Sequence, residues 1–189
     1  MIQPPSYSAI FPAASGEHWH IVRAAESGED WHPQARQLLF HWMRACGSDG
    51  QLPGRTTIDH PGLGDLLPSL WMLDVERTPW RFRYRMAGAG FTATIGREVG
   101  TGWYDELRPL AWIANRRRLI TTARNGLPTW SRGPLPLEAD VPASCGECDV
   151  ENLILPLACD GVTVDALLGI TVPYKPDQAW RTTAPQAAQ

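Results

Sequence analysis

Residues 80–86 read WRFRYRM, in which large apolar residues and arginines alternate without a break. Successive side chains of a strand point to opposite faces, so the apolar members are expected on one face and the arginines on the other. The inward set is Trp80, Phe82, Tyr84 and Met86. The preceding stretch SLWMLDVE (69–76) also alternates, and RTP (77–79) can form a turn. The sequence therefore predicts an antiparallel hairpin over residues 69–87.

The glycines that follow this hairpin do not form a phosphate-binding loop. A dinucleotide fingerprint needs the pattern G-x-G-x-x-G after a buried strand. After Gly88 and Gly90 the next glycine is Gly96, so the spacing is wrong. A strand that alternates with arginine is also unlike a parallel strand buried on both faces. Gly88 and Gly90 are therefore expected to end the strand and turn the chain.

Two longer helices are predicted. The first begins near Pro33, which suits the first helical position, and ends before the glycine of GSDG. Its buried stripe is expected to contain Ala35, Leu38, Leu39, Trp42, Met43 and Cys46. The second runs from about Pro109 to the C-cap at Asn125-Gly126. Its inner stripe is expected to contain Leu110, Ile113, Ala114, Arg117, Ile120 and Thr121.

The rest of the chain is strand-rich after residue 127. PTWSRG (128–133) predicts a short strand, and residues 151–172 predict a hairpin with Asp160-Gly161 at its turn. A short helix is expected at 61–67. Segment 1–29, with its prolines and small polar residues, is expected to be mostly disordered, although Trp19 and Ile21 can dock on the body of the domain. Segment 177–189 is also expected to be disordered. These elements predict one α+β domain over 30–176.

Composition narrows the class of protein. The chain has 189 residues and a net charge of -3, which gives no general attraction to nucleic acid or anionic membranes. No stretch approaches the ~20 apolar residues needed to span a bilayer, and the N-terminus lacks the pattern of a secretion signal. Four cysteines do not indicate a disulfide scaffold. A cytoplasmic protein is expected, with no nucleic acid or membrane among its partners.

Catalytic and metal-binding patterns are weak. The five histidines do not pair with a serine or cysteine nucleophile, and no H-E-x-x-H or G-x-S-x-G motif occurs. Cys145 and Cys148 have the spacing of half a metal site, but Cys46 and Cys159 do not form a second pair. We therefore expect neither an enzyme nor a metal protein.

Three stretches together resemble the PAS family. They are LPGRTTIDHPGLGDLLPSLWMLDVE (52–76), FRYRMAGAGFTATIGREVGTGWYDEL (82–107) and LILPLACDGVTVDALLGIT (153–171). They are similar to the bacterial single-PAS proteins common in alphaproteobacteria. Those proteins have a Leu-Pro-x-Arg stretch, an Asp-x-Pro step, an Arg-Tyr-Arg-x-x-Gly strand end and a hairpin with Asp-Gly at its turn. The resemblance covers about residues 33–172.

The resemblance implies a five-stranded antiparallel sheet with helices over one face, to which the helix from Pro33 is an N-terminal addition. It also implies a sensor or interaction domain without its own output domain, which acts through an unidentified signalling protein and can form a homodimer. The flavin photosensor motif Asn-Cys-Arg-Phe-Leu is missing, and the long helix has no histidine for haem. The cofactor is therefore unknown, and a small organic ligand, or none, is expected.

The ligand pocket is expected between the sheet and the helices. The candidate residues, placed on the predicted inner faces, are Phe91, Trp103, Trp112, Ile113 and Arg117. Three alternatives stay open. The chain can be an adaptor whose core is filled by its own tryptophans, or a small-ligand enzyme with Asp105 or Tyr104 as acid or base. It can also bind a cyclic dinucleotide or another phosphate ligand through the arginine-rich stretch 77–132.

Overall fold

The computed structural model describes residues 18–23, 28, 30–56, 61–136, 138 and 149–174. The elements, in chain order, are β1 (His18–Ile21), α1 (Pro33–Ala45), the 3-10 helix η1 (Pro61–Ser69), β2 (Leu70–Arg77), β3 (Trp80–Ala87), α2 (Ala89–Ile95), α3 (Tyr104–Leu107), α4 (Pro109–Asn125), β4 (Thr129–Pro134), β5 (Asp149–Leu157) and β6 (Ala166–Tyr174). The predicted α+β class is confirmed.

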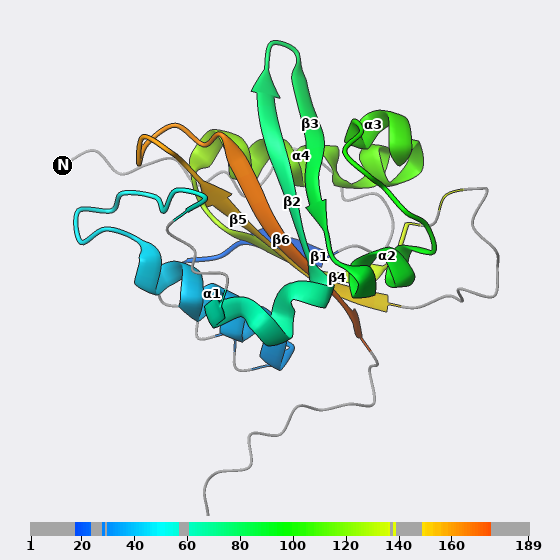
Figure 1. Cartoon of the computed structure of the whole chain (residues 1–189), viewed down its shortest axis with the longest axis horizontal. Helices are drawn as coiled ribbons and strands as arrows, with labels where there is room; N and C mark the ends of the chain where they lie inside the picture. The colour runs from blue at the N-terminus through cyan, green and yellow to red at the C-terminus, as the bar shows by residue number, and fades with distance from the viewer. Residues whose placement is uncertain are drawn as a thin grey trace, which may run out of the picture.

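One antiparallel sheet organises the molecule (Figure 1). Its strand order is β1-β4-β5-β6-β2-β3. The predicted hairpin β2–β3 therefore lies at one edge, and its inner strand β2 pairs with the last strand β6. This order places β2, from the middle third of the chain, beside β6, from the last third, while β1 and β3 form the two edges.

The sheet has six strands rather than the five expected, because residues 18–21 pair with β4. This strand lies within the segment 1–29 that is expected to be mostly disordered, and it contains Trp19 and Ile21, the two residues expected to dock. Its end is held by the hydrogen bond from the Val22 N–H to the Pro128 carbonyl at 2.8 Å. The strand satisfies backbone groups that β4 would otherwise expose at the edge. The predicted tail 177–189 lies outside the described residues.

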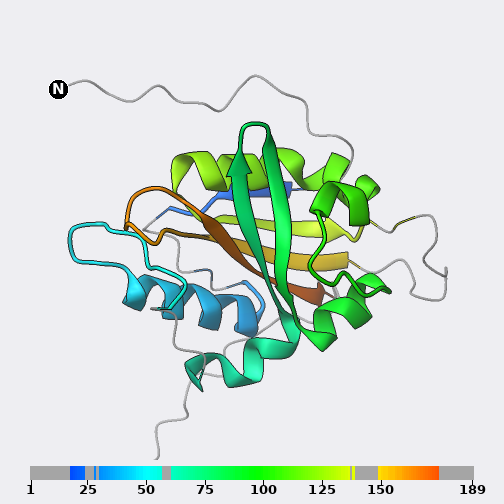
Figure 2. The same cartoon turned by 45° about the horizontal axis from the view of Figure 1, so that its top comes forward.

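Helices cover both faces of the sheet (Figure 2). α1 and η1 pack on one face, against a core that includes Leu153, Leu155 and Leu168. α2, α3 and α4 cover the other face, against a core that includes Phe82, Tyr84 and Ile154. The two cores alternate along β5 because successive strand residues point to opposite faces. The added N-terminal helix thus covers the face that the three later helices leave open.

Helix α1 has the predicted bounds within a residue. His32 precedes it and accepts a hydrogen bond on Nδ1 from the Gln34 N–H at 3.2 Å, while Pro33 occupies the first helical position. The residues buried against the sheet are Ala35, Leu38, Leu39 and Trp42. The prediction that Met43 also faces inward is wrong, since its side chain is 44% exposed. One face of α1 contacts the sheet, and Met43 lies at the margin of that face.

The hairpin departs from strict alternation at one residue. Leu73 pairs with Tyr84, but the preceding residue Met72 pairs with Met86, so Arg85 is the extra residue of a bulge. Phe82 and Tyr84 face α2–α4, whereas Met86 packs against the core on the α1 side. The expectation that Met86 shares a face with Tyr84 is therefore wrong.

Helix α4 has the predicted bounds, Pro109–Asn125, with Gly126 at φ 65° as its C-cap. Its inner face differs from the prediction. The buried residues are Ala111, Asn115, Arg118, Leu119, Thr122 and Ala123. This face is rotated by about one residue, or ~100°, from the expected stripe. Polar groups on the inner face find partners there: the Thr122 and Thr129 hydroxyls lie 2.7 Å apart, and both residues are fully buried.

Candidate functional site

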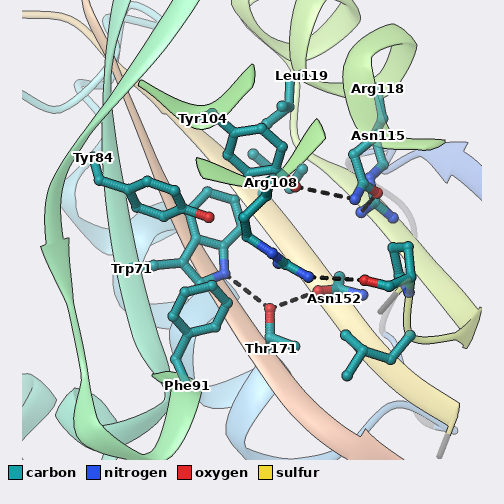
Figure 3. Close-up of a pocket in the computed structure, with 13 residues that line it drawn as sticks. Trp71, Tyr84, Phe91, Tyr104, Arg108, Asn115, Arg118, Leu119, Asn152 and Thr171 are labelled. Carbon is teal, nitrogen blue, oxygen red and sulfur yellow. Dashed lines mark hydrogen bonds between the residues drawn. The ribbon is translucent and has the colours of Figure 1, made fainter. Parts of the chain in front are cut away.

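A small cavity lies between the sheet and helices α2–α4 (Figure 3). Strands β2, β3, β5 and β6 form its floor, and α2, α3, α4 and the segment after β4 form its walls. Its polar lining consists of Tyr84, Tyr104, Arg108, Asn115, Arg118, Asn152 and Thr171. Its apolar lining includes Trp71, Phe91, Leu119 and Ile154. Polar side chains at this density, inside a domain core, are unusual for a region that serves packing alone.

The floor carries a fixed chain of hydrogen bonds. The Trp71 Nε1–H donates to Thr171 Oγ1 at 2.9 Å, and the Thr171 hydroxyl donates to Asn152 Oδ1 at 2.6 Å. Because Asn152 Oδ1 is an acceptor, its amide nitrogen must occupy the other branch of the side chain. This orientation presents the Asn152 NH₂ group as a donor.

Arg108 reaches into the cavity from the junction of α3 and α4. It is 3% exposed, and its Nη2 donates to the Pro136 carbonyl at 2.9 Å. Its Nε atom has no hydrogen-bond partner, and Arg108 forms no ion pair with any carboxylate in the described part of the chain. A buried cation without a counter-charge costs several kcal/mol. Figure 3 shows the Arg108 side chain among the residues that line the cavity.

A second buried arginine belongs to a network on α4. Arg118 Nη2 donates to Asn115 Oδ1 at 2.7 Å, and Asn115 Nδ2 donates to the Tyr104 hydroxyl at 3.1 Å. Arg118 is 4% exposed. This network ties α3 to α4 and places further positive charge at the cavity wall.

The acid on this wall serves the backbone. Glu138 is buried, and its carboxylate accepts hydrogen bonds from the Leu110 and Ala111 N–H groups at 3.1 and 3.0 Å. These N–H groups are the unsatisfied donors of the first turn of α4, where a negative charge is stabilised. Glu138 therefore anchors the start of α4, directly after Arg108.

Two tyrosines in the cavity stay protonated at neutral pH. Burial raises the pKa of Tyr84 well above its ordinary value, the neighbouring Tyr104 adds to the rise, and Arg108 opposes it. The pKa of Tyr104 is also raised, chiefly by burial, and Arg108 and Asn115 oppose the shift. The Tyr84 hydroxyl is buried without a hydrogen-bond partner of good geometry. Both hydroxyls are suited to hydrogen bonding and neither to acting as a base.

The free space is small. The space that the centre of a water molecule can occupy in the cavity measures about 20 Å³, which is enough for one or two waters. Aromatic rings occupy much of the rest: Tyr84 and Tyr104 are stacked with their centroids 5.4 Å apart, and the Tyr84 and Phe91 rings are tilted with their centroids 6.2 Å apart. A ligand with more than a few atoms would have to displace side chains.

Of the residues predicted to line a pocket, the structure places one in this cavity. Phe91 lies on its wall. Trp112 packs beside the cavity, with its ring 5.9 Å from that of Phe82 and 6.2 Å from that of Tyr104. Trp103 lies outside, along the edge of β3, where the Arg81 guanidinium stacks 4.2 Å from its ring centroid. Ligand binding by Phe91 stays a prediction.

The other two predicted pocket residues face away from the cavity. Ile113 is 75% exposed, and Arg117 is exposed with its guanidinium 5.6 Å from the Trp19 ring. The predicted inward orientation of Ile113 and Arg117 is wrong for one reason: α4 turns the side that carries Asn115 and Arg118 toward the sheet. The charge expected of Arg117 is supplied by its neighbour Arg118.

Several residues that line the cavity are not among those predicted from the sequence. Asn152 and Thr171 stand in apolar runs, at positions whose parity matches inward-facing Ile154 and Leu167. A polar residue at an inward position of a buried strand is a signal that was available. Arg108 had no such signal, because its position at the junction of α3 and α4 depends on the tertiary fold.

The weak metal signal receives no support within the described residues. They contain no group of three or more His, Cys, Asp or Glu side chains able to hold a metal ion. Cys46 and Cys159 are free thiols. Cys145 and Cys148 lie outside the described residues.

The sequence profile of the PAS domain matches residues 31–172, three quarters of the chain. The chain belongs to the PAS family. Its strand order, with the first hairpin at one edge and the last strand in the centre, is consistent with that assignment. No curated protein matches the chain.

Membership in the PAS family indicates a sensory or regulatory role, because PAS domains are generally sensory rather than catalytic. The cavity described above lies on the face of this fold that α2, α3 and α4 cover. Within the described part of the chain, none of the helices has the length and hydrophobicity to cross a bilayer.

Proposed function

We propose that this chain is a sensory domain that takes a small molecule into the cavity between the sheet and α2–α4 and passes the bound state to a signalling protein. The observation that carries the proposal is that two buried polar groups, the Tyr84 hydroxyl and the Arg108 Nε–H, converge on one cavity and neither makes a hydrogen bond of good geometry. An unsatisfied buried donor costs free energy, and a ligand that accepts its hydrogen bond recovers that cost. From the resemblance to single-PAS proteins, the same proposal includes that the protein is bacterial, that it is located in the cytoplasm and that it forms a homodimer.

Native mass spectrometry of the purified protein, compared with its denatured mass, tests this function. Extra mass in the native spectrum alone is the expected result, and it identifies a retained non-covalent ligand. A variant that fills the cavity, Thr171→Leu, is expected to lose that mass, whereas the outward substitution Val162→Leu is expected to keep it, since Val162 is 75% exposed. Retained mass in Thr171→Leu would place the ligand elsewhere.

A second candidate function is that of an adaptor with a filled core. The small volume of the cavity favours it, because Trp71, Tyr84, Phe91 and Tyr104 already occupy most of the space. A bare mass in the native spectrum, together with an unchanged melting temperature over a panel of small molecules, would favour the adaptor. The enzyme alternative has less support, since Tyr104 is buried with a raised pKa and Asp105 pairs with Arg81 at 3.2 Å outside the cavity.

A further inference from the structure

We propose that the ligand of this cavity is a small organic carboxylate, held by Arg108 and by the amide nitrogen of Asn152. This inference rests on the proposed function, which it extends from an unspecified small molecule to a class of anion. It identifies Arg108 as the residue that anchors the charge.

The first support is the charge balance of the cavity. Arg108 is 3% exposed, its Nη2 donates to the Pro136 carbonyl and its guanidinium interacts with the Tyr84 hydroxyl, yet no ion pair neutralises it in the described part of the chain. Arg118 adds a second buried guanidinium to the lining. The buried acid on this wall, Glu138, is held by the first turn of α4. The charge of Arg108 is therefore not neutralised by a carboxylate of the described part of the chain, in a place where water is largely excluded, and this favours an anion beside Arg108.

The second support is the arrangement of donors. An arginine guanidinium presents N–H groups in a planar fork that fits a planar carboxylate. The Nε–H of Arg108 is buried without a partner, and the Asn152 amide is turned by Thr171 so that its NH₂ group is available. Asn152 forms no hydrogen bond through that nitrogen in the described part of the chain. Arg108, Asn152 and Tyr84 all line this one small cavity (Figure 3).

The third support concerns the size and the body of the ligand. The volume of about 20 Å³ suits a compact group better than a tetrahedral phosphate with a nucleoside attached. The apolar side chains of Phe91, Leu119 and Ile154 complete the lining and can contact a short alkyl chain. A carboxylate with few carbon atoms satisfies both the charged and the apolar part of the wall.

Thermal denaturation with matched probe pairs tests this inference. The probes are sodium acetate and sodium propionate, their neutral isosteres acetamide and propionamide, and inorganic phosphate, all at equal ionic strength. We expect the two carboxylates to raise the melting temperature of the wild type and the amides and phosphate to leave it unchanged. Arg108→Gln is expected to weaken carboxylate binding by at least about tenfold, the usual loss for a hydrogen bond to a charged group. Arg124→Gln is the control, because Arg124 is exposed on the same helix.

A second variant keeps the test valid if Arg108→Gln does not fold. Asn152→Asp places a carboxylate beside Arg108 and still accepts the Thr171 hydroxyl. It is expected to melt at a higher temperature than the wild type without any probe and to lose the response to acetate. A lower melting temperature for Asn152→Asp would overturn the inference.

The outcomes separate this inference from the function on which it rests. Equal shifts by amides and carboxylates, or a response to phosphate alone, would reject a carboxylate but keep a ligand cavity. Undiminished carboxylate binding by Arg108→Gln would also reject the role of Arg108. No shift with any probe would overturn the inference, and the native mass spectrum would then decide whether a sensory ligand exists.

Discussion

The indole ring of Trp71 on β2 occupies the space directly over Gly169 on β6, where any side chain at residue 169 would have to lie. The two residues are direct partners in the antiparallel pairing of β2 with β6. The absence of a side chain at Gly169 lets Trp71 lie over β6, and from there its Nε1–H reaches Thr171 Oγ1. The floor of the cavity therefore depends on one glycine.

Gly169→Ala is expected to destabilise the protein by about 1–3 kcal/mol, the usual cost of forcing an extra methyl group into a packed core. The methyl group would overlap the Trp71 ring and separate Trp71 from Thr171. Urea unfolding measures the free energy. Gly64→Ala is the control, because a Cβ at Gly64 would meet nothing within 4 Å. An equal effect of the two substitutions would contradict the packing of Trp71 on Gly169.

A buried ion pair fixes the start of α1 to the sheet. The Glu151 side chain is fully buried and accepts from Arg132 Nη2 and from the His32 N–H, each at 2.7 Å. Glu151→Ala removes the counter-charge of Arg132 and is expected to cost about 3–5 kcal/mol in the free energy of unfolding.

The exposed pair of Arg81 and Glu106 is the matched comparison for Glu151. Glu106 is 62% exposed, so solvent screens its attraction to Arg81. Glu106→Ala is expected to leave the urea midpoint almost unchanged. Similar midpoints for Glu151→Ala and Glu106→Ala would show that burial of the ion pair contributes little.

His32 makes the stability depend on pH. Burial lowers its pKa below the ordinary value of 6.5, and Arg132 adds to the decrease while Glu151 opposes it. In the neutral form Nδ1 accepts the Gln34 N–H, and a proton on Nδ1 would remove this acceptor. As the pH falls through about 6.5, the unfolded chain therefore binds a proton that the folded chain does not, and stability decreases. Below the folded pKa the contribution of His32 no longer changes.

Urea unfolding from about pH 7.5 to about pH 5.5 checks this dependence. The free energy of unfolding is expected to fall over that range in the wild type. His32→Asn retains an acceptor at the helix start but cannot titrate, so its stability should fall less. An identical pH profile for the two proteins would assign the dependence to other groups.

The orientation of α4 can be tested with two residues on the same helix. Leu119 is 1% exposed and Ile113 is 75% exposed. Leu119→Ala is expected to cost about 2–5 kcal/mol, as for other large-to-small changes in a core. Ile113→Ala is expected to change stability by less than about 0.5 kcal/mol. A large effect at Ile113 would restore the inner stripe that the sequence predicts.

Much of the secondary structure could be predicted because its signals are local. Pro33 and Pro109 begin helices, Gly126 ends one, and the alternation of residues 80–84 describes a strand with one buried face. Such signals depend on the backbone preferences of residues next to each other in the chain. The α+β class followed from them, and the PAS family followed from motifs spread over three segments.

The candidate site could not be predicted to the same extent. Its polar residues come from strands and helices up to a hundred positions apart, such as Trp71 and Thr171. The inner face of α4 is a second example. A buried helix face is predicted from a stripe of hydrophobic residues, and this criterion passes over Arg118 and Asn115 because both are polar. Their burial is favoured by partners such as Tyr104, whose place is fixed by α3 and not by α4.

The sequence by itself determined where the two longer helices and most strands begin and end, because capping and alternation act between neighbours in the chain. Tertiary structure decided which way those elements face. The bulge at Arg85 turned Met86 to the opposite core, β4 provided the edge to which residues 18–21 pair, and the sheet surface selected the buried side of α4. The side that a helix or strand turns toward the core is decided by packing and by hydrogen bonds to residues distant in the chain. These contacts exist only once the chain has folded.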